Sequence, residues 1–341
     1  MKSLWKKLAV AAAALGASFS AHAEGSDAPK PLPQREKVVV AMTAKVEAYI
    51  PMILADRMGE FDKENIDIEY TFAKSSDGIV LLSTGRADVL GGQPSAAVFN
   101  AIASGADIRV VAPLFVQSAA QKQGIWANNA FLNGRKFTVD LFKDQTIASA
   151  IGLGSTASYF LQTELDKVGL SLKDVKFQTM ASPDILVALE NGAVNFGYLI
   201  DSIWQKADAS KVSLAFVQGP EMSAGSWSFG PRLLKERRDV GEAMMRALVR
   251  TTRTYLQGDY HKDPEVLKVM VEELQLPEET LQKGVSLTFD PNLYMPADLA
   301  ARLQKTYALI PEVLSYTELM PEGRVVDQGF IAAAGIPIPA K

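Results

Sequence analysis

The sequence predicts an α/β protein with two doubly wound lobes, and three observations lead to this prediction. First, the stretch that begins at Asp77 occurs again, without a gap, from Asp184. Second, each copy has an acidic residue in a first helical turn, an apolar helix stripe, a glycine stop and a short buried strand. Third, short apolar runs alternate with helical patterns along the chain, as in parallel sheets. The equivalent positions pair Asp77 with Asp184, Gly85 with Gly192, Asp88 with Asn195, and Ser95 with Ser202.

The composition is that of a globular protein with a large core. The chain of 341 residues is 48% hydrophobic and 22% charged, and as a rough prior its length corresponds to about two domains. It contains no cysteine, which excludes disulfides, thiolate catalysis and a lipid-modified N-terminal cysteine. Its two histidines, His22 and His261, are too few for a histidine-based triad or metal cluster. We therefore expect no metal, no cofactor and no catalytic residues.

Residues 1–23 have the pattern of a secretory signal peptide. Three lysines and no acidic residue accompany an apolar run from Leu8 to Phe19, and Ala21-His22-Ala23 is a small-x-small cleavage site. The apolar run is shorter than the ~20 residues that a membrane span needs, which disfavours the alternative of a membrane anchor. We expect a periplasmic protein that begins near Glu24 and is not a lipoprotein.

The charge of the mature chain argues against a nucleic-acid partner. Loss of the three lysines takes the formal net charge from −4 to −7, and no basic patch stands out. Residues 24–36, with three prolines, are expected to form a flexible or extended lead-in. Residues 331–341 are expected to form a loosely held tail.

Two crossings between the lobes are expected. The run Lys37–Met42 is typical of a buried parallel strand, and the alternation of strands and helices continues to the polar stretch 117–129, where we place the first crossing. The turn-rich stretch 220–228 is the expected return crossing, and the chain beyond it has helical patterns expected to pack outside the first lobe. The predicted division is 37–122 for the first part of lobe I, 123–225 for lobe II, and 226–330 for the remainder of lobe I.

The candidate binding loops follow from where open α/β sheets hold their ligands. Ligands bind beyond the carboxyl ends of the strands, where loops lead into helix N-termini. The unpaired N–H groups and the dipole at those termini favour anionic or strongly polar groups. The loops selected in this way are Thr43–Ile50, Ala73–Asp77, Gly92–Ser95, Gly154–Ala157, Ala181–Asp184 and Asp201–Trp204.

Two of these loops carry the sharpest site candidates. Gly154 permits close approach of the backbone, and Ser155 and Thr156 place two hydroxyls beside free N–H groups. Plain helix capping explains the same residues equally well. Gln93 and Ser95 face the same two interpretations.

Further polar and aromatic residues leave two interpretations open. Asp201 would attract an amine and repel an anion in the cleft, or it caps a helix. Trp227 stacks on a ligand, or it packs at the hinge. Lys45 and Glu47 could recognise charge, but they are more simply solvated loop charges. His261 is most simply a surface residue at a helix end.

Several segments together resemble a known family. They are Pro51–Glu69, Gly85–Asp88, Gly154–Thr156 and Leu165–Val175. They resemble the solute-binding proteins of ABC importers for nitrate, taurine and alkanesulfonates, with their thiamine-precursor-binding relatives. The resemblance covers about residues 38–228 and implies a type II periplasmic binding fold whose two lobes close around a ligand. By position it implies ligand contacts at Thr43, Gln93, Ser95, Ser155, Thr156 and Asp201.

The resemblance also implies a function. We expect a monomer that captures a small polar solute and delivers it to an ABC permease with its cytoplasmic ATPase. The family often has a Trp-Glu-Pro turn where this chain has Ile200-Asp201-Ser202, which weakens any transfer of substrate identity.

Two alternatives to transport remain. One is an extracytoplasmic ligand sensor. The other is an enzyme like the fungal thiamine-pyrimidine synthases, which use a cofactor-bearing lysine, a histidine and a cysteine-rich segment. This chain has no cysteine and thus lacks groups that such chemistry needs.

Overall fold

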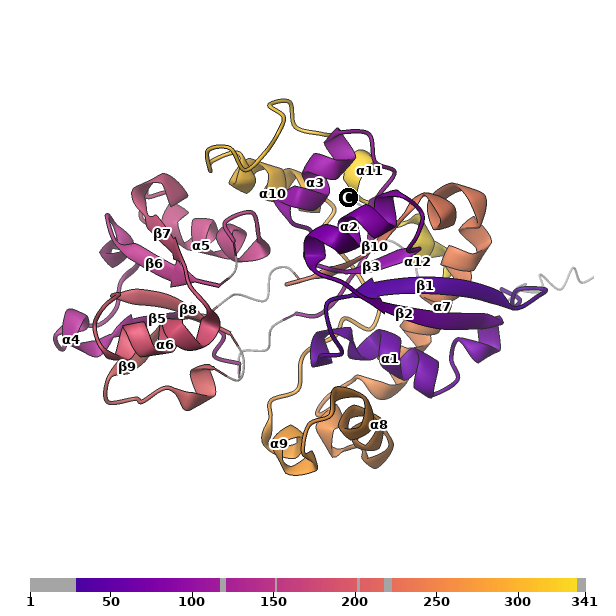
Figure 1. Cartoon of the computed structure of the whole chain (residues 1–341), viewed down its shortest axis with the longest axis horizontal. Helices are drawn as coiled ribbons and strands as arrows, with labels where there is room; N and C mark the ends of the chain where they lie inside the picture. The colour runs from indigo at the N-terminus through magenta and orange to yellow at the C-terminus, as the bar shows by residue number, and fades with distance from the viewer. Residues whose placement is uncertain (1–28, 117–120, 151, 201–202, 218–222, 336–341) are drawn as a thin grey trace, which may run out of the picture. The chain divides into compact units, whose positions relative to one another are not determined.

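The structure, a computed structural model, describes residues 29–116, 121–150, 152–200, 203–217 and 223–335 (Figure 1). The predicted signal peptide, Asp201, Ser202 and the end of the predicted tail lie outside the described residues. Within these ranges, no helix has both the length and the apolar character needed to span a membrane.

The described chain contains two five-stranded sheets of the same topology (Figure 1). The first has the order β2-β1-β3-β10-β4, and the second has the order β7-β6-β8-β5-β9. The strands of the first sheet are β1 (Glu36–Met42), β2 (Ile66–Phe72), β3 (Val89–Gly92), β4 (Arg109–Pro113) and β10 (Ser226–Phe229). Those of the second are β5 (Gly124–Asn128), β6 (Thr146–Ser149), β7 (Lys176–Thr179), β8 (Phe196–Leu199) and β9 (Val212–Val217). The predicted α/β class with two lobes is confirmed.

Each sheet is mixed, not purely parallel as the strand–helix alternation suggested. β10 runs antiparallel to both β3 and β4, and β5 runs antiparallel to both β8 and β9. The sequence pattern did not predict β10, because this short strand follows a turn-rich stretch and precedes a long helical region. Its side chains are nevertheless core residues, since Trp227 and Phe229 are 1% and 0% exposed. Figure 1 shows this late strand beside the early strand β3.

The repeated stretch is a repeated structure. Helix α2 (Ser75–Ser83) leads to β3, and helix α6 (Ser182–Glu190) leads to β8. Every boundary of the second copy lies 107 residues after the first: 75 to 182, 83 to 190, 89 to 196 and 92 to 199. Gly85 and Gly192 have φ of 70° and 73°, the left-handed conformation that ends a helix and favours glycine. The predicted duplication is therefore confirmed.

The remaining helices pack on the sheets or on one another, and local chemistry sets several of their ends. Pro51 stands in the first turn of α1, where its missing N–H costs no helical bond. Asp263 caps α8, because its side chain accepts the backbone N–H groups of Glu265 and Val266 at 2.9 and 3.1 Å. The helices are α1 (Ile50–Arg57), α3 (Ala96–Ala103), α4 (Asn129–Leu132), α5 (Thr156–Asp166), α7 (Arg238–Tyr255), α8 (Pro264–Leu274), α9 (Glu278–Lys283), α10 (Leu299–Tyr307), α11 (Glu322–Val325) and α12 (Gly329–Ala333).

The C-terminal helices do not all pack as the sequence suggested. α7 packs on α1 and α12 beside the first sheet, as expected. α10 contacts both α3 and α5, so it touches helices of both sheets. The Tyr307 hydroxyl donates to the Pro94 carbonyl oxygen at 2.9 Å, and Arg302 Nη1 donates to the Tyr159 hydroxyl at 3.3 Å. The expectation that this helix lies only outside the first lobe was wrong. Its residues form hydrogen bonds both to the loop before α3, beside the first sheet, and to α5, beside the second sheet.

A buried carboxylate ties the first sheet to the returning chain. Asp88 is 0% exposed and accepts the Val39 N–H at 2.9 Å. The same carboxylate pairs with Arg237 at 2.9 Å and with Arg232 at 3.2 Å. At the equivalent position of the second copy, the neutral Asn195 donates to Gln145 Oε1 at 2.8 Å. Only the first copy therefore depends on buried charge.

Truncation of Asp88 and of the equivalent Asn195 is predicted to lower the free energy of unfolding by different amounts. Asp88→Ala leaves the Val39 N–H without its acceptor and removes one of the two carboxylates that pair with Arg237, so we expect a loss of about 2 to 4 kcal/mol in the free energy of unfolding. Asn195→Ala removes a neutral hydrogen bond and should cost about 1 kcal/mol. Urea denaturation of the two variants measures both values. Equal losses would contradict the role assigned to Asp88.

Candidate functional site

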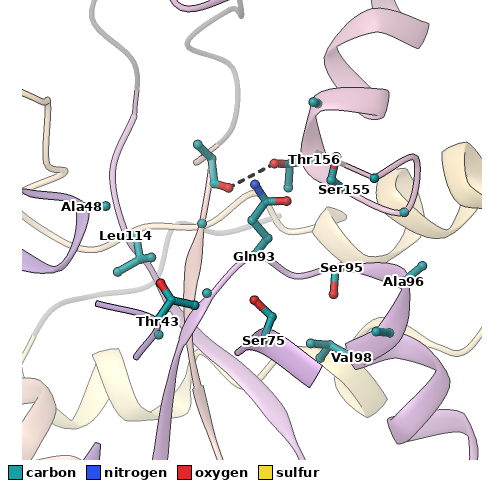
Figure 2. Close-up of a pocket in the computed structure, with 18 of the residues that line it drawn as sticks. Thr43, Ala48, Ser75, Gln93, Ser95, Ala96, Val98, Leu114, Ser155 and Thr156 are labelled. Carbon is teal, nitrogen blue, oxygen red and sulfur yellow. Dashed lines mark hydrogen bonds between the residues drawn. The ribbon is translucent and has the colours of Figure 1, made fainter. Parts of the chain in front are cut away.

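A cavity of about 700 Å³ lies at the ends of strands from both sheets (Figure 2). Its walls come from the loops after β1, β2, β3, β4 and β6, and from residues that precede β5 and β10. This is where open α/β sheets place their ligands. The volume falls in the range of pockets for small molecules.

Five of the seven side chains singled out in the sequence line this cavity: Thr43, Gln93, Ser95, Ser155 and Thr156. Figure 2 shows them around one space, although they come from loops far apart in the sequence. Asp201 lies outside the described residues. Trp227 is buried and is not among the lining residues. Their roles as ligand contacts stay predictions.

The lining lacks charge throughout the described residues. The polar side chains that line the cavity carry only hydroxyl or amide groups, and they alternate with apolar ones such as Ile79, Leu114 and Phe115. An anion in this cavity would therefore depend on backbone N–H groups and helix dipoles for positive potential. The polar members are Thr43, Tyr49, Ser75, Gln93, Ser95, Asn100, Gln123, Ser155, Thr156 and Tyr198.

Ser155 is the most informative of these residues. It occupies the N-cap of α5 in an extended conformation and is 5% exposed, yet its side chain makes no capping hydrogen bond. Its buried hydroxyl has no partner among the described residues. Plain capping therefore does not account for this hydroxyl. A buried polar atom without a partner costs free energy, and a ligand in the cavity would supply the missing bond.

Thr156 has a different role from its neighbour. Its Oγ1 donates to the Ala224 carbonyl oxygen at 3.0 Å, as the dashed line in Figure 2 shows. Ala224 lies on the segment that leads into β10. This bond holds the start of α5 against the returning chain, so the hydroxyl is already engaged.

The loop before α5 accepts a backbone hydrogen bond from the N-terminus of α3. The Ala96 N–H donates to the Gly154 carbonyl oxygen at 2.9 Å. The approach is close, because a Cβ on Gly154 would lie 2.9 Å from Ala96 Cβ and 3.4 Å from Val313 Cγ1. One of the α3 donors is thereby used, and α5 remains the helix start with an unpaired buried hydroxyl.

Trp227 supports one wall of the cavity from behind. Its ring centroid lies 5.8 Å from that of Tyr49, which lines the cavity. The Tyr49 hydroxyl donates to the Gly91 carbonyl oxygen at 3.2 Å, and a Cβ on Gly91 would lie 2.6 Å from Trp227. Burial raises the pKa of Tyr49, so the phenol stays neutral. The packing alternative for Trp227 describes its position better than ligand stacking.

Glu47 and His261 are not the solvated groups that the sequence suggested, whereas Lys45 is a partly exposed loop charge. Lys45 forms a salt bridge with Glu273. Glu47 accepts hydrogen bonds from the Tyr260 hydroxyl and from His261 Nε2, the latter at 2.8 Å, and His261 is 1% exposed. The expectations of a solvated Glu47 and a surface histidine were wrong, because residues distant in sequence pack over these two side chains.

The Glu47–His261 pair lies next to the cavity wall along the chain. Ala48 and Tyr49, which follow Glu47 directly, line the cavity. Burial of the imidazole acts to lower the pKa of His261, but the hydrogen bond and charge of Glu47 outweigh it, and the pKa is raised.

Tyr49 and Ser75 also line the cavity, although nothing in the sequence singled them out as individual residues. Both belong to loops selected in the sequence, so the topological rule located them without distinguishing them. Gln123, which also lines the cavity, precedes β5 in the stretch expected to cross between lobes. Its position in the predicted crossing was the sequence feature that could have marked Gln123 as a cavity residue.

The architecture and the cavity together define a class of protein. Two mixed α/β sheets of equal topology, with a solute-sized cavity at the strand ends of both, constitute a periplasmic binding protein fold. Residues 47–225, just over half of the chain, match the family model described as NMT1/THI5 like. The chain belongs to this family. No curated protein matches the sequence.

Solved structures extend the likeness across most of the chain. The periplasmic sulfonate-binding protein SsuA of Methylobacillus flagellatus KT, part of a putative sulfonate ABC transporter, has a TM-score of 0.66 at 16% identity, covering 89% of this chain and 94% of that one. The periplasmic nitrate-binding protein NrtA of Synechocystis PCC 6803 has 0.61 at 12% identity, covering 88% of each chain. The desulfurization enzyme DSZB has 0.57 at 13% identity, covering 88% and 99%. At these identities, the likeness establishes the fold alone.

The Glu47–His261 pair predicts a pH dependence of stability. Because the folded pKa of His261 lies above its ordinary value of about 6.5, the pair's contribution is fully present below pH 6.5 and is lost as pH rises through the folded pKa. In the mature chain that the sequence predicts, His261 is the only histidine. Glu47→Gln should remove this dependence.

Urea denaturation of the wild type and Glu47→Gln between pH 5.5 and 9 measures the effect. The difference in unfolding free energy should be largest at the acidic end and shrink as pH rises. A difference that stays constant over this range would show that the pair does not titrate as described.

Proposed function

We propose that this chain is the extracytoplasmic solute-binding component of an ABC importer. One observation carries the proposal: a cavity formed at both sheets, with no charged side chain in its described lining, contains a buried hydroxyl on Ser155 at the start of α5. This hydroxyl has no partner in the described structure. Such a site suits a small molecule held by both lobes and released when they separate. The binding proteins among the structural neighbours give independent support for this class.

The solute that suits the cavity has a compact anionic or strongly polar group and an apolar remainder. The N-terminus of α5 supplies positive potential and N–H donors for the polar group. The apolar lining suits a carbon skeleton. Sulfonates and taurine-like molecules have both parts, whereas nitrate has the compact anionic group alone. The neighbours named for sulfonate and nitrate support these candidates. Asp201 as a contact for an amine belongs to the same proposal.

Delivery to a permease and its ATPase completes the proposed function. The signal-peptide pattern of residues 1–23 supports periplasmic location, and the absence of cysteine in the sequence argues against a lipid anchor. The proposed lobes are residues 37–122 with 226–330, and residues 123–225. The strands in these ranges belong to different sheets, which supports this division.

An enzymatic function is the weaker candidate. One structural neighbour is a desulfurization enzyme, but at 13% identity it shares only the fold. The described cavity lining offers no histidine or charged side chain as a general base. The hydroxyl of Ser155 therefore has no activating group beside it in the described lining. A binding role needs only the neutral hydroxyl and amide groups that the described lining provides.

Removal of the unpaired hydroxyl tests the proposed site. Isothermal titration calorimetry of the mature protein with methanesulfonate, taurine and nitrate should find a solute that binds one to one. Ser155→Ala should weaken that binding about 10- to 100-fold, because a hydrogen bond to a charged group is lost. Ser158→Ala on the same helix is the control, since its hydroxyl already donates to the Leu153 carbonyl oxygen at 2.6 Å. Equal affinity for Ser155→Ala and the wild type would contradict the assignment.

The close approach at Gly154 gives a second test. Gly154→Ala places a methyl group against Ala96 and Val313, so the loops separate and the bound state is disfavoured. We expect binding to weaken by roughly tenfold. A Cβ on Gly152 meets no atom within 4 Å, which makes Gly152→Ala the matched control. Calorimetry that finds the same affinity for both variants would argue against closure at this contact.

A further inference from the structure

His261 is a buried imidazole whose two ring nitrogens both face hydrogen-bond acceptors. Its Nε2 lies 2.8 Å from the Glu47 carboxylate, and its Nδ1 lies 3.4 Å from the Gly284 carbonyl oxygen. An ionised carboxylate and a carbonyl oxygen accept hydrogen bonds and cannot donate them. A neutral imidazole has one N–H group and can satisfy only one of the two acceptors. The surroundings therefore suit the imidazolium, which donates from both nitrogens.

Glu47 connects this imidazole to the wall of the cavity. It begins a single turn of 3₁₀ helix, in which Ala48, labelled in Figure 2, and Tyr49 line the cavity. The Glu47 carboxylate accepts hydrogen bonds from the Tyr260 hydroxyl as well as from His261. A carboxylate held by two buried donors has little freedom to move, so these bonds fix the position of the turn.

Gly284 connects the imidazole to a second part of the chain. It begins the segment 284–288, which pairs with the residues that follow β4. The Val116 N–H donates to the Thr288 carbonyl oxygen at 2.8 Å, and the Thr288 N–H donates back at 3.3 Å. Val116 directly precedes residues 117–129, where the first crossing between the lobes is predicted. The imidazole therefore links the cavity wall to the start of that predicted crossing.

We infer that His261 is a positioning residue for solute binding, which holds the cavity wall and the start of the proposed crossing together through Glu47 and Gly284. The imidazolium bonds to both, whereas the neutral ring has to release one of them. The released part is then less ordered, and a solute has to order it on binding, which lowers affinity. The solute should therefore bind more tightly while His261 is protonated. This role rests on the proposed function and adds regulation of the same site by pH.

The charged groups around His261 support a change of protonation in an accessible pH range. Glu47 and Asp259 act on the imidazole, and Asp259 also pairs with Lys262 at 2.8 Å. The neighbouring Tyr260 stays neutral, because burial and the charge of Glu47 raise the pKa of its phenol well above the ordinary value. Burial acts to lower the pKa of His261, but the two carboxylates outweigh burial and raise this pKa. The ring therefore loses its proton above its ordinary pKa of about 6.5.

Proton NMR of the mature protein tests the inference directly. His261 is the only histidine in the mature chain that the sequence predicts, so one imidazole signal reports its protonation. The signal is titrated without solute and with whichever of methanesulfonate, taurine and nitrate binds. If protonation tightens binding about fivefold, reciprocity requires that saturating solute raise the pKa of His261 by about 0.7. A pKa that solute leaves unchanged or lowers would overturn the inference.

Calorimetry between pH 5.5 and 8, where these three solutes keep their charge, gives the matching measurement. The wild-type affinity should fall about fivefold as the pH rises through the pKa of His261. In His261→Gln the amide can still donate to Glu47 but does not titrate, so its affinity should be constant and equal to that of the deprotonated wild type. Ser155→Ala is the control, because it should bind more weakly at every pH and keep the fivefold change.

The outcomes separate this inference from the proposed function. A wild-type affinity that does not vary with pH, or a His261→Gln affinity that varies as the wild type does, would overturn the role of His261 and leave the proposed function in place. Melting temperatures at each pH check that both proteins are folded. Failure of all three solutes to bind the wild type would instead defeat the proposed function.

Discussion

The first sheet of this protein is completed by a strand that arrives after the second sheet has been made. β3 and β4 both form backbone hydrogen bonds to β10 and not to each other. Without β10, the facing edges of two buried strands would lack partners, at a substantial free-energy cost. The chain therefore has to pass through the second sheet and return before the first sheet is whole. This requirement places the segments before β5 and β10 beside the cavity.

The same constraint explains which parts of the fold could be predicted from sequence. The copies from Asp77 and Asp184 could be recognised because their helices, glycine turns and buried strands are local patterns. β10 could not, since its partners lie more than a hundred residues earlier in the chain and only pairing makes Ser226–Phe229 a strand. The surroundings of Glu47 and His261 were hidden for a similar reason: their contact joins residues 214 positions apart. Local patterns carry no record of such contacts.

The candidate site shows the same division. Helix starts at strand ends led to Thr43, Gln93, Ser95, Ser155 and Thr156, and all five line the cavity. The sequence could not distinguish a capping hydroxyl from an unpaired one. That difference depends on the loop before α5 facing the start of α3, where the Gly154 carbonyl oxygen accepts the Ala96 N–H. Because the described part of the lining has no charged side chain, such pairing decides which helix start is available to a ligand.

We propose that one solute is held between the two lobes at the start of α5. A crystal structure of the mature protein with its tightest-binding solute tests this most directly. The solute should contact residues of both sheets, and its polar group should lie within hydrogen-bond distance of Ser155 Oγ. A solute bound to one lobe alone, or bound elsewhere on the surface, would show that the two lobes do not share a site at α5.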